Sequence, residues 1–107
     1  MIEDKYILTI GELLLRCKKV IDNEWDLLAF VFDIGDGHIA NSGFLYSGEK
    51  IRPASASIED EPLLLDDKIF ELQELVAQKF GHKFIQLLIQ MESKTNRIKI
   101  EFEFDDL

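Results

Sequence analysis

Apolar and charged residues alternate at the end of the chain, where every second residue of segment 97–104 is Ile or Phe and the others are charged. A period of two is typical of a β-strand that buries one face and exposes the other. The apolar segment 84–92 predicts a partner strand, with a turn at 93–96 between the two. We expect an inward row of Ile98, Ile100, Phe102 and Phe104 and an outward row of Lys99, Glu101 and Glu103.

A first amphipathic helix is predicted from near Glu3 to about residues 22–23, because apolar residues recur there every three or four positions. A later start at Thr9 stays open, since Gly11 disfavours helix by about 1 kcal/mol relative to alanine. The predicted apolar stripe consists of Tyr6, Ile10, Leu13, Leu14, Cys17, Val20 and Ile21.

A second helix is predicted from Asp66 to Phe80, where apolar residues again recur at helical spacing. Asp66 and Asp67 suit the positive N-terminal end of the helix dipole. Gly81 is placed to end the helix, because glycine readily adopts the left-handed conformation of that position.

The segment between these helices has strand character. Aromatic and aliphatic residues predict a strand over 25–33, a glycine turn at 35–37 and a returning strand over 38–46. Small and polar residues interrupt the returning strand, so we expect an edge position or a bulge there. Residues 51–53 predict a short edge strand, and 54–63 predict one long loop.

The predicted element order is α-β-β-(β)-α-β-β in a single domain spanning residues 1–107. We expect an α+β fold, a two-layer sandwich with a mostly antiparallel sheet of four to five strands and two helices on one face. The helices are expected to cover the face that carries the inward row, which leaves the other face free to meet a partner.

The net charge of the chain indicates which classes of partner it can bind. The formal net charge of −9 disfavours direct binding to nucleic acid or to an anionic membrane surface and favours basic protein partners. The single Cys17 excludes an internal disulfide, and no leader-like or membrane-spanning segment is recognised. We therefore expect a soluble cytoplasmic protein.

No motif in the sequence predicts catalysis, a cofactor or a metal, and we expect no enzyme. Glu101 and Glu103 would lie about 7 Å apart on one strand face, but such pairs are usually solvated surface. His38 and His82 fall in separate turns without a nucleophile motif. The segment 33–37 lacks the further oxygen ligands of a calcium loop, and no phosphate-binding glycine loop is present.

Dense acidity is the remaining signal. Acidic residues gather in the loop at 59–61, in the second helix, and at the end of the chain in Glu101, Glu103, Asp105 and Asp106. The simplest interpretation of the helix cluster is a solvated surface. For the C-terminal cluster we favour a surface that speeds association with a basic protein.

The order of features resembles the YezG-like antitoxin or immunity proteins of bacteria. The resemblance rests on the opening helix, Trp25 before an aromatic strand with Leu28, Phe30 and Phe32, the returning Phe44-Leu45-Tyr46, Phe70-Glu71-Leu72, and the ending 97–107. The chain departs from the family pattern at 40–43 and 47–62.

This resemblance implies a small cytoplasmic protein that binds and neutralises a toxin, often a basic nuclease domain encoded beside it. An acidic surface would compete for the groove that such a nuclease uses to hold nucleic acid. The residues expected to form the contact are Glu101, Glu103, Asp105 and Asp106, with Asp33 and Asp36 beside them.

Two alternatives stay open. A homo-oligomeric domain, such as a homodimer, or an adaptor domain would use an apolar patch of Phe84, Leu88, Leu27 and Val31 on the exposed sheet face. A hydrolase would need a cleft that holds an acid with a strongly raised pKa.

Overall fold

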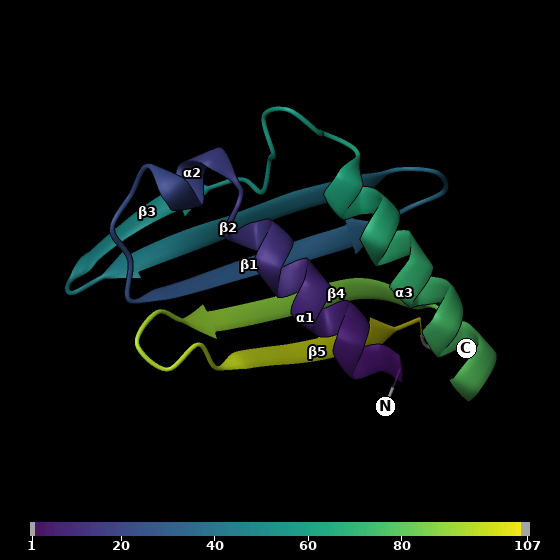
Figure 1. Cartoon of the computed structure of the whole chain (residues 1–107). Helices are drawn as coiled ribbons and strands as arrows, with labels where there is room; N and C mark the ends of the chain where they lie inside the picture. Colours follow the sequence, from purple (N-terminus) through teal and green to yellow (C-terminus); the bar gives the residue numbers. More distant parts are fainter. Residues whose placement is uncertain (1, 106–107) are drawn as a thin grey trace.

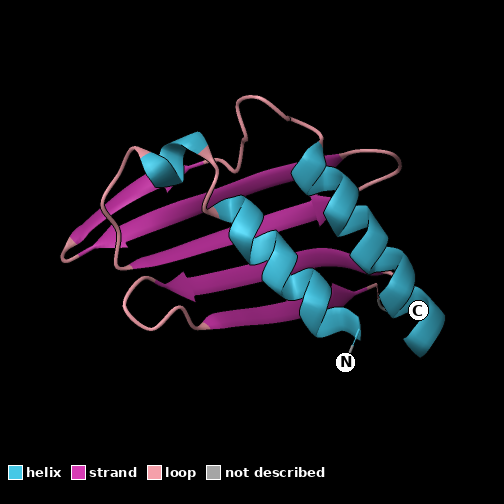
Figure 2. Cartoon of the chain, viewed as in Figure 1, coloured by secondary structure: helices cyan, strands magenta, loops and turns pink. Residues whose placement is uncertain are grey.

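The fold is a two-layer α+β sandwich in which one antiparallel sheet is covered on one face by helices (Figure 1, Figure 2). The computed structural model describes residues 2–105, with side chains from residue 4 onward. Its elements are α1 (Ile2–Leu14), α2 (Lys18–Ile21), β1 (Leu27–Ile34), β2 (Ile39–Ser47), β3 (Lys50–Ala54), α3 (Leu64–Phe80), β4 (Phe84–Glu92) and β5 (Ile98–Phe104). The predicted fold class is confirmed.

The five strands lie in the order β3-β2-β1-β4-β5, and every neighbouring pair is antiparallel. The central strand β1 pairs with β4 from the other half of the chain, so the β1–β2–β3 meander and the β4–β5 hairpin are joined along β1 and β4. Strand β2 lies between β1 and β3. The returning strand was expected at an edge or with a bulge; it is instead an interior strand in unbroken register with β1, so this prediction is wrong, and β3 occupies that edge.

Two residues of β2 explain how a weak strand sequence fits an interior position. Gly43 lies opposite Phe30, and an added Cβ atom would come within 2.4 Å of the Phe30 ring. Only glycine leaves room for that ring. The amide of Asn41 takes the place of a strand partner, because its Oδ1 accepts from the Ala56 N–H at 2.8 Å and its Nδ2 donates to the Ala56 carbonyl at 3.2 Å.

The core lies between the sheet and the helices. Strand β1 sends alternate residues into it, and α1 and α3 pack over them side by side (Figure 1). The largest fully buried side chains are Phe30, Phe32, Phe84, Ile10, Leu14, Leu28, Leu45, Ile69, Leu72, Leu87, Ile89 and Val76. Hydrophobic burial of this kind is the main favourable term in folding.

The prediction of one continuous first helix is wrong, although its early start is confirmed. Helix α1 ends at Leu14, and Cys17 adopts an extended conformation (φ −67°, ψ 137°) before α2. The Lys18 N–H then donates to the Ser57 carbonyl at 3.1 Å, which ties the break to the loop before α3. Because α2 has a new direction, Ile21 leaves the predicted apolar stripe and is 65% exposed.

Helix α3 begins two residues before the predicted start and ends as predicted at Gly81, which has a left-handed φ of 81°. Gln73 is the one polar residue buried among those described. Its Nε2 donates to the Phe84 carbonyl at 2.8 Å. A buried carbonyl without such a donor would cost about 1–3 kcal/mol, so Gln73 fixes the start of β4 beneath α3.

A register shift between Phe84 and Gln86 interrupts the alternation at the start of β4. Strict alternation from Leu88 places Phe84 on the exposed face, but the bulge turns its side chain into the core, where it is fully buried. Its ring lies 4.7 Å from that of Phe102. The prediction that Phe84 belongs to an exposed apolar patch is therefore wrong. Phe104 follows the inward row but is partly exposed at the strand end.

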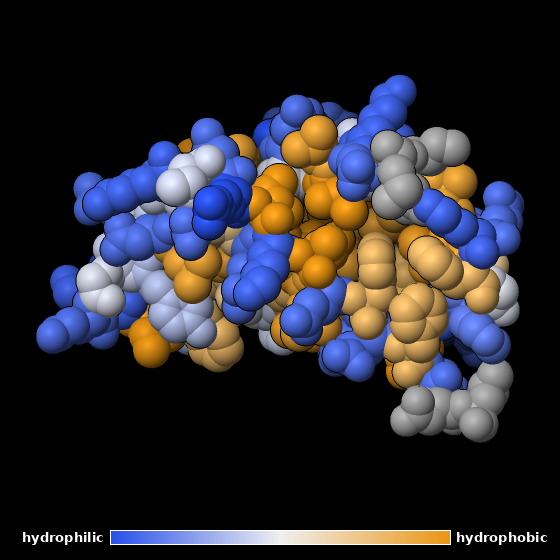
Figure 3. Space-filling model, turned by 90° about the horizontal axis from the view of Figure 1, so that it is seen from below, coloured by the Kyte–Doolittle hydropathy of each residue, from blue (hydrophilic) through white to orange (hydrophobic). Residues whose placement is uncertain are grey.

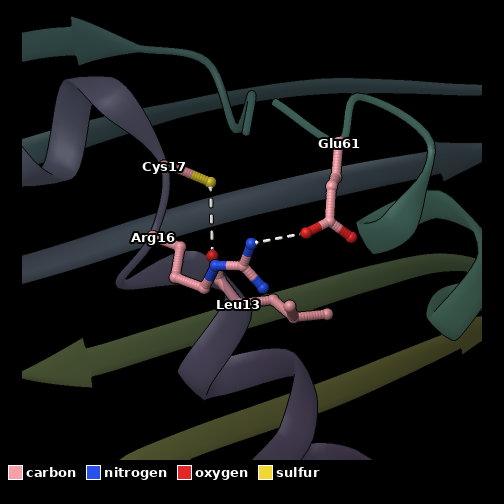
Figure 4. Close-up of polar contacts among 4 residues, drawn as sticks. All are labelled: Leu13, Arg16, Cys17 and Glu61. Carbon is pink, nitrogen blue, oxygen red and sulfur yellow. Dashed lines mark hydrogen bonds and ion pairs between the residues drawn. The ribbon is translucent and has the colours of Figure 1, made fainter. Parts of the chain in front are cut away.

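The break between α1 and α2 buries the only cysteine. Figure 4 shows the Cys17 Sγ directed at the Leu13 carbonyl, 3.6 Å away, and the Arg16 guanidinium 2.9 Å from Glu61. Burial raises the pKa of the Cys17 thiol to about 11, against smaller lowering effects of a backbone hydrogen bond from Ser57 and of the Arg16 charge.

Cys17 is therefore expected to react with iodoacetamide at pH 8 at least about a hundredfold more slowly than a free cysteine, since the thiolate is the reacting form. Mass spectrometry of native and urea-unfolded protein measures the two rates. The unfolded chain should react fully. A native rate equal to the unfolded one would show that the segment between α1 and α2 opens readily.

Candidate protein-binding face

The sheet face opposite the helices is not covered by any described element, because α1, α2 and α3 all lie on the same side (Figure 1). We call it the open face. Alternate residues of each strand point to it, and many are apolar. Among its apolar residues are Leu27, Ala29, Val31, Phe44, Tyr46, Ile51, Pro53 and Leu88. Such a surface on a small domain commonly marks an interaction site.

The strand register gathers most of these residues at one end of the face, while Val31 and Leu88 lie in the same row as Glu101. Leu27 pairs with Tyr46, which pairs with Ile51, and one row further Ala29 pairs with Phe44. Phe44 is 44% exposed and Ile51 is 60% exposed. Leu27, Val31 and Leu88 were predicted on this face, and the structure confirms their placement. The aromatic and β3 contributions were missed, because the sequence does not reveal which strands lie beside β1.

The opposite end of the open face is acidic. Asp33 pairs with Gln86, and Gln86 pairs with Glu103, so the backbones of Asp33 and Glu103 lie two strand spacings apart, roughly 10 Å. The Gln86 Nε2 donates to Asp33 Oδ1 at 2.8 Å and orients that carboxylate. Glu101 lies one row away, opposite Leu88. We call Asp33, Glu101 and Glu103 the acidic corner; all three side chains are exposed.

The remaining predicted contact residues lie elsewhere. Asp36 is in the β1–β2 turn, beside a hollow of about 580 Å³ that Phe70, Glu74 and Lys83 also line. Asp36 therefore lies at the end of the sheet next to α3, and it does not join the acidic corner. Asp105 directly follows β5 and is exposed, while Asp106 lies outside the described residues.

A cationic region lies on the same face: the outward direction of Lys99 was predicted, but the basic end that it forms with Arg97 was not. Lys99 lies opposite Gln90 in the β4–β5 pair, and with Arg97, Glu92 and Leu27 these residues line a hollow of about 520 Å³. The open face is therefore acidic at one end of β5 and basic at the other, with the sign changing between Lys99 and Glu101. This order was visible in the sequence, but only the strand register shows what lies beside it.

Acidic residues of the helix layer have local roles. Glu61 pairs with Arg16 at 2.9 Å, and Glu74 pairs with Lys83 at 3.1 Å, all at well-exposed positions. Such surface pairs contribute about 0–1 kcal/mol each. Partial burial, and then the neighbouring charge of Asp67, raise the pKa of Asp66 at the start of α3. The exposed pair of Glu74 fits the interpretation of the helix cluster as a solvated surface, whereas Asp66 is partly buried.

The described residues contain no group of three or more His, Cys, Asp or Glu side chains placed to hold a metal ion. None of the helices in the described chain is long and apolar enough to span a membrane. His38 is exposed, with its Nδ1 3.3 Å from the Asp36 carbonyl, and His82 is exposed just after α3. Glu101 and Glu103 are exposed on the open face.

The uncovered open face, with its apolar residues and its acidic corner, is the structural feature from which we argue a function. No protein-family model matches this sequence, and a search of curated proteins finds no significant match.

Proposed function

We propose that this chain is a protein-binding module that docks its open face on a basic protein, and that its partner is a toxin domain of the nuclease type, which it neutralises. The observation that supports this most directly is an uncovered sheet face with apolar side chains at one end and the acidic corner at the other. Such an immunity protein would act in the cytoplasm, by covering the active surface of the toxin.

The apolar end would supply the affinity. Tyr and Phe residues dominate many interfaces because they bury a large area at a small entropic cost. Phe44 and Tyr46 are alternate residues of β2 on the open face, with ring centroids 6.4 Å apart. Beside them Ile51 extends the patch to the edge strand β3. A partner seated here would remove these side chains from water without any rearrangement of the core.

The acidic corner would supply orientation and rate. A nuclease must present positive charge to phosphate, so a carboxylate surface of matching position attracts it over long range. Asp33 is held by Gln86, which reduces the freedom lost when it pairs with a cation. The resemblance to YezG-like immunity proteins supports the same type of partner.

The test uses the protein encoded beside this chain, purified as a nuclease domain, with stopped-flow association and nucleic-acid cleavage as readouts. We expect this chain to inhibit cleavage at equimolar concentration. Reversing the acidic corner with Asp33→Lys, Glu101→Lys and Glu103→Lys should slow association at low salt by about 10- to 100-fold. The difference should shrink as salt screens the charges.

A matched control reverses three exposed acids of the helix layer, Glu12, Glu59 and Asp60, which changes the net charge by the same amount. This control should associate nearly as fast as the parent chain. If both triple variants slow association equally, only net charge matters and the open face is not the contact. If the neighbouring protein is neither basic nor bound, the proposed function is wrong.

A further inference from the structure

Strand β5 has one unpaired side, because it is an edge of the sheet. The Ser93 N–H donates to the Asp26 carbonyl at 2.9 Å and the Glu92 N–H donates to the Arg97 carbonyl at 3.0 Å, so successive residues of this hairpin bond to opposite sides. By this alternation, the backbone N–H and C=O groups of Ile98, Ile100 and Phe102 point to the free edge. They form a row of donors and acceptors ready for another strand.

The two edges of the sheet differ in how they are protected. Strand β3 has five residues and contains Pro53, which cannot donate a hydrogen bond to a new strand. Strand β5 has seven residues and contains neither proline nor glycine. Edge strands of this length and regularity are the ones that pair with further strands.

We propose that two copies of this chain associate through β5, antiparallel and centred on Ile100, so that their sheets become continuous. Two-fold pairing at this centre places Lys99 opposite Glu101 of the second copy and Arg97 opposite Glu103. Symmetry repeats both pairs, which gives four contacts of opposite charge. On the other face Ile98 meets Phe102, and Ile100 meets its own copy.

The direction of the backbone groups agrees with this register. Since Ile98, Ile100 and Phe102 present their backbone groups to the edge, their pairs are the hydrogen-bonded ones. The charged pairs then occupy the non-hydrogen-bonded positions, where Cα atoms approach to about 4.5 Å and side chains interact more closely.

Neighbouring registers are less favourable. Centring the pair on Glu101 places two Glu101 carboxylates directly opposite each other, and centring it on Lys99 does the same with two ammonium groups. Like charges directly opposite each other are destabilising. Registers halfway between these would place a charged side chain of one copy directly opposite an apolar side chain of the other. The sequence of charges therefore selects Ile100 as the centre.

These charged groups are available for such pairing. Within the described chain, the side chains of Arg97, Lys99, Glu101 and Glu103 form no hydrogen bond or ion pair. All four residues are exposed.

An apolar band adjoins the same edge. Figure 3 views the molecule from the β5 side and shows apolar surface across its middle, surrounded by hydrophilic residues. Gly11 of α1 faces Ile98; Leu8 lies three positions before it on α1, and Leu15, four positions after it, directly follows the helix. Leu8 is 59% exposed and Leu15 is 43% exposed. A second copy at β5 would shield part of this band from water.

The inference does not depend on the proposed function, although Glu101 and Glu103 take part in both. Lys99→Glu separates the two, because it places like charges at the dimer contact while it makes the open face more acidic. A basic partner should therefore bind this variant at least as fast as the parent, whereas self-association should be lost.

The experiment is sedimentation equilibrium of the full chain at micromolar concentration, with Lys99→Glu, Glu101→Lys and their equimolar mixture. The parent should be a dimer, and each variant alone should have a dimer dissociation constant raised roughly tenfold or more, since two opposite pairs become like pairs. In the mixture, each introduced carboxylate faces an introduced ammonium group across the two chains, so the heterodimer should form with parent-like affinity. The double variant Lys99→Glu with Glu101→Lys should also dimerise.

Amide hydrogen exchange gives an independent readout. In the parent dimer the Ile98, Ile100 and Phe102 amides should be protected, and in Lys99→Glu they should exchange rapidly while the β4 amides stay protected. A monomeric parent would overturn the proposal. So would a dimer that both single variants leave intact, or a mixture that remains monomeric although each variant is folded by circular dichroism.

Discussion

Replacing Gly43 with alanine should destabilise the protein by about 3 kcal/mol, because overpacking in a filled core costs about 1–3 kcal/mol and this site allows little relief. An added Cβ would lie 2.4 Å from Phe30 Cδ1 and 2.5 Å from the Ala29 carbonyl oxygen. A ring can turn, but the second contact is with backbone. Strand β2 would have to move away from β1, which weakens the ladder between them. Urea unfolding followed by far-ultraviolet circular dichroism measures the loss.

Ser42→Ala is the matched control, since Ser42 precedes Gly43 on β2 and is exposed on the open face opposite Val31. Its effect should stay within about 0.5 kcal/mol. A Gly43→Ala variant as stable as this control would mean that β2 does not approach Phe30 as described.

The central architecture was predictable because its causes are local. Alternation in 97–104 indicated the faces of β5, the glycines at 35–37 indicated the first hairpin, and Gly81 indicated the end of α3. All three were confirmed. Each rests on a pattern within about ten residues, where the periods of strands and helices and the conformational freedom of glycine act directly.

The corrections come from contacts between distant residues. The break after Leu14 is fixed by the Lys18 bond to Ser57, and the bulge before Gln86 accompanies a carbonyl bonded to Gln73. Neither partner can be inferred from the periodicity of its own segment. Likewise, the small residues in β2 indicated an edge strand, but position 43 needs a glycine because it lies opposite Phe30, whose ring leaves no room for a side chain.

The predicted contact residues also differ in whether a local pattern or a contact between distant strands places them. Glu101 and Glu103 were placed by alternation within one strand, and their outward direction is confirmed. Whether Asp33 or Asp36 joins them depends on the order of the strands, and the pairing of β1 with β4 and of β4 with β5 brings only Asp33 into the row of Glu103. The role of these carboxylates in binding stays a prediction.

The open face and the β5 edge make different demands on the same strand. Side chains at odd positions of β5 point to the open face, while backbone groups at even positions point to the edge. A partner on the face would contact the first set, and a second copy at the edge would use both. Pairing of Glu101 with Lys99 of the second copy would lower the acidity that a basic partner meets, so the dimer would be the slower-binding form.

Replacing Phe32 with alanine should cost about 3–5 kcal/mol, the usual range for removing a buried Phe ring. Phe32 is fully buried on the helix-covered face, with its ring centroid 6.3 Å from that of Phe30. The same change at Phe44 removes the same atoms from the neighbouring strand, but on the open face. Because Phe44 is 44% exposed, its loss should cost under about 1 kcal/mol. Urea unfolding of both variants, under conditions where the chain is monomeric, compares the two faces directly.

The comparison decides which face of the sheet is the interior. Equal losses for Phe32 and Phe44 would show that something covers the open face in the folded chain, and the proposed docking site would then be buried. A large loss at Phe32 alone, together with weaker binding of the basic partner by Phe44→Ala, would place stability on one side of the sheet and recognition on the other. That separation is what allows Phe44 to remain exposed without a cost to the fold, because the core under α1 and α3 is complete without it.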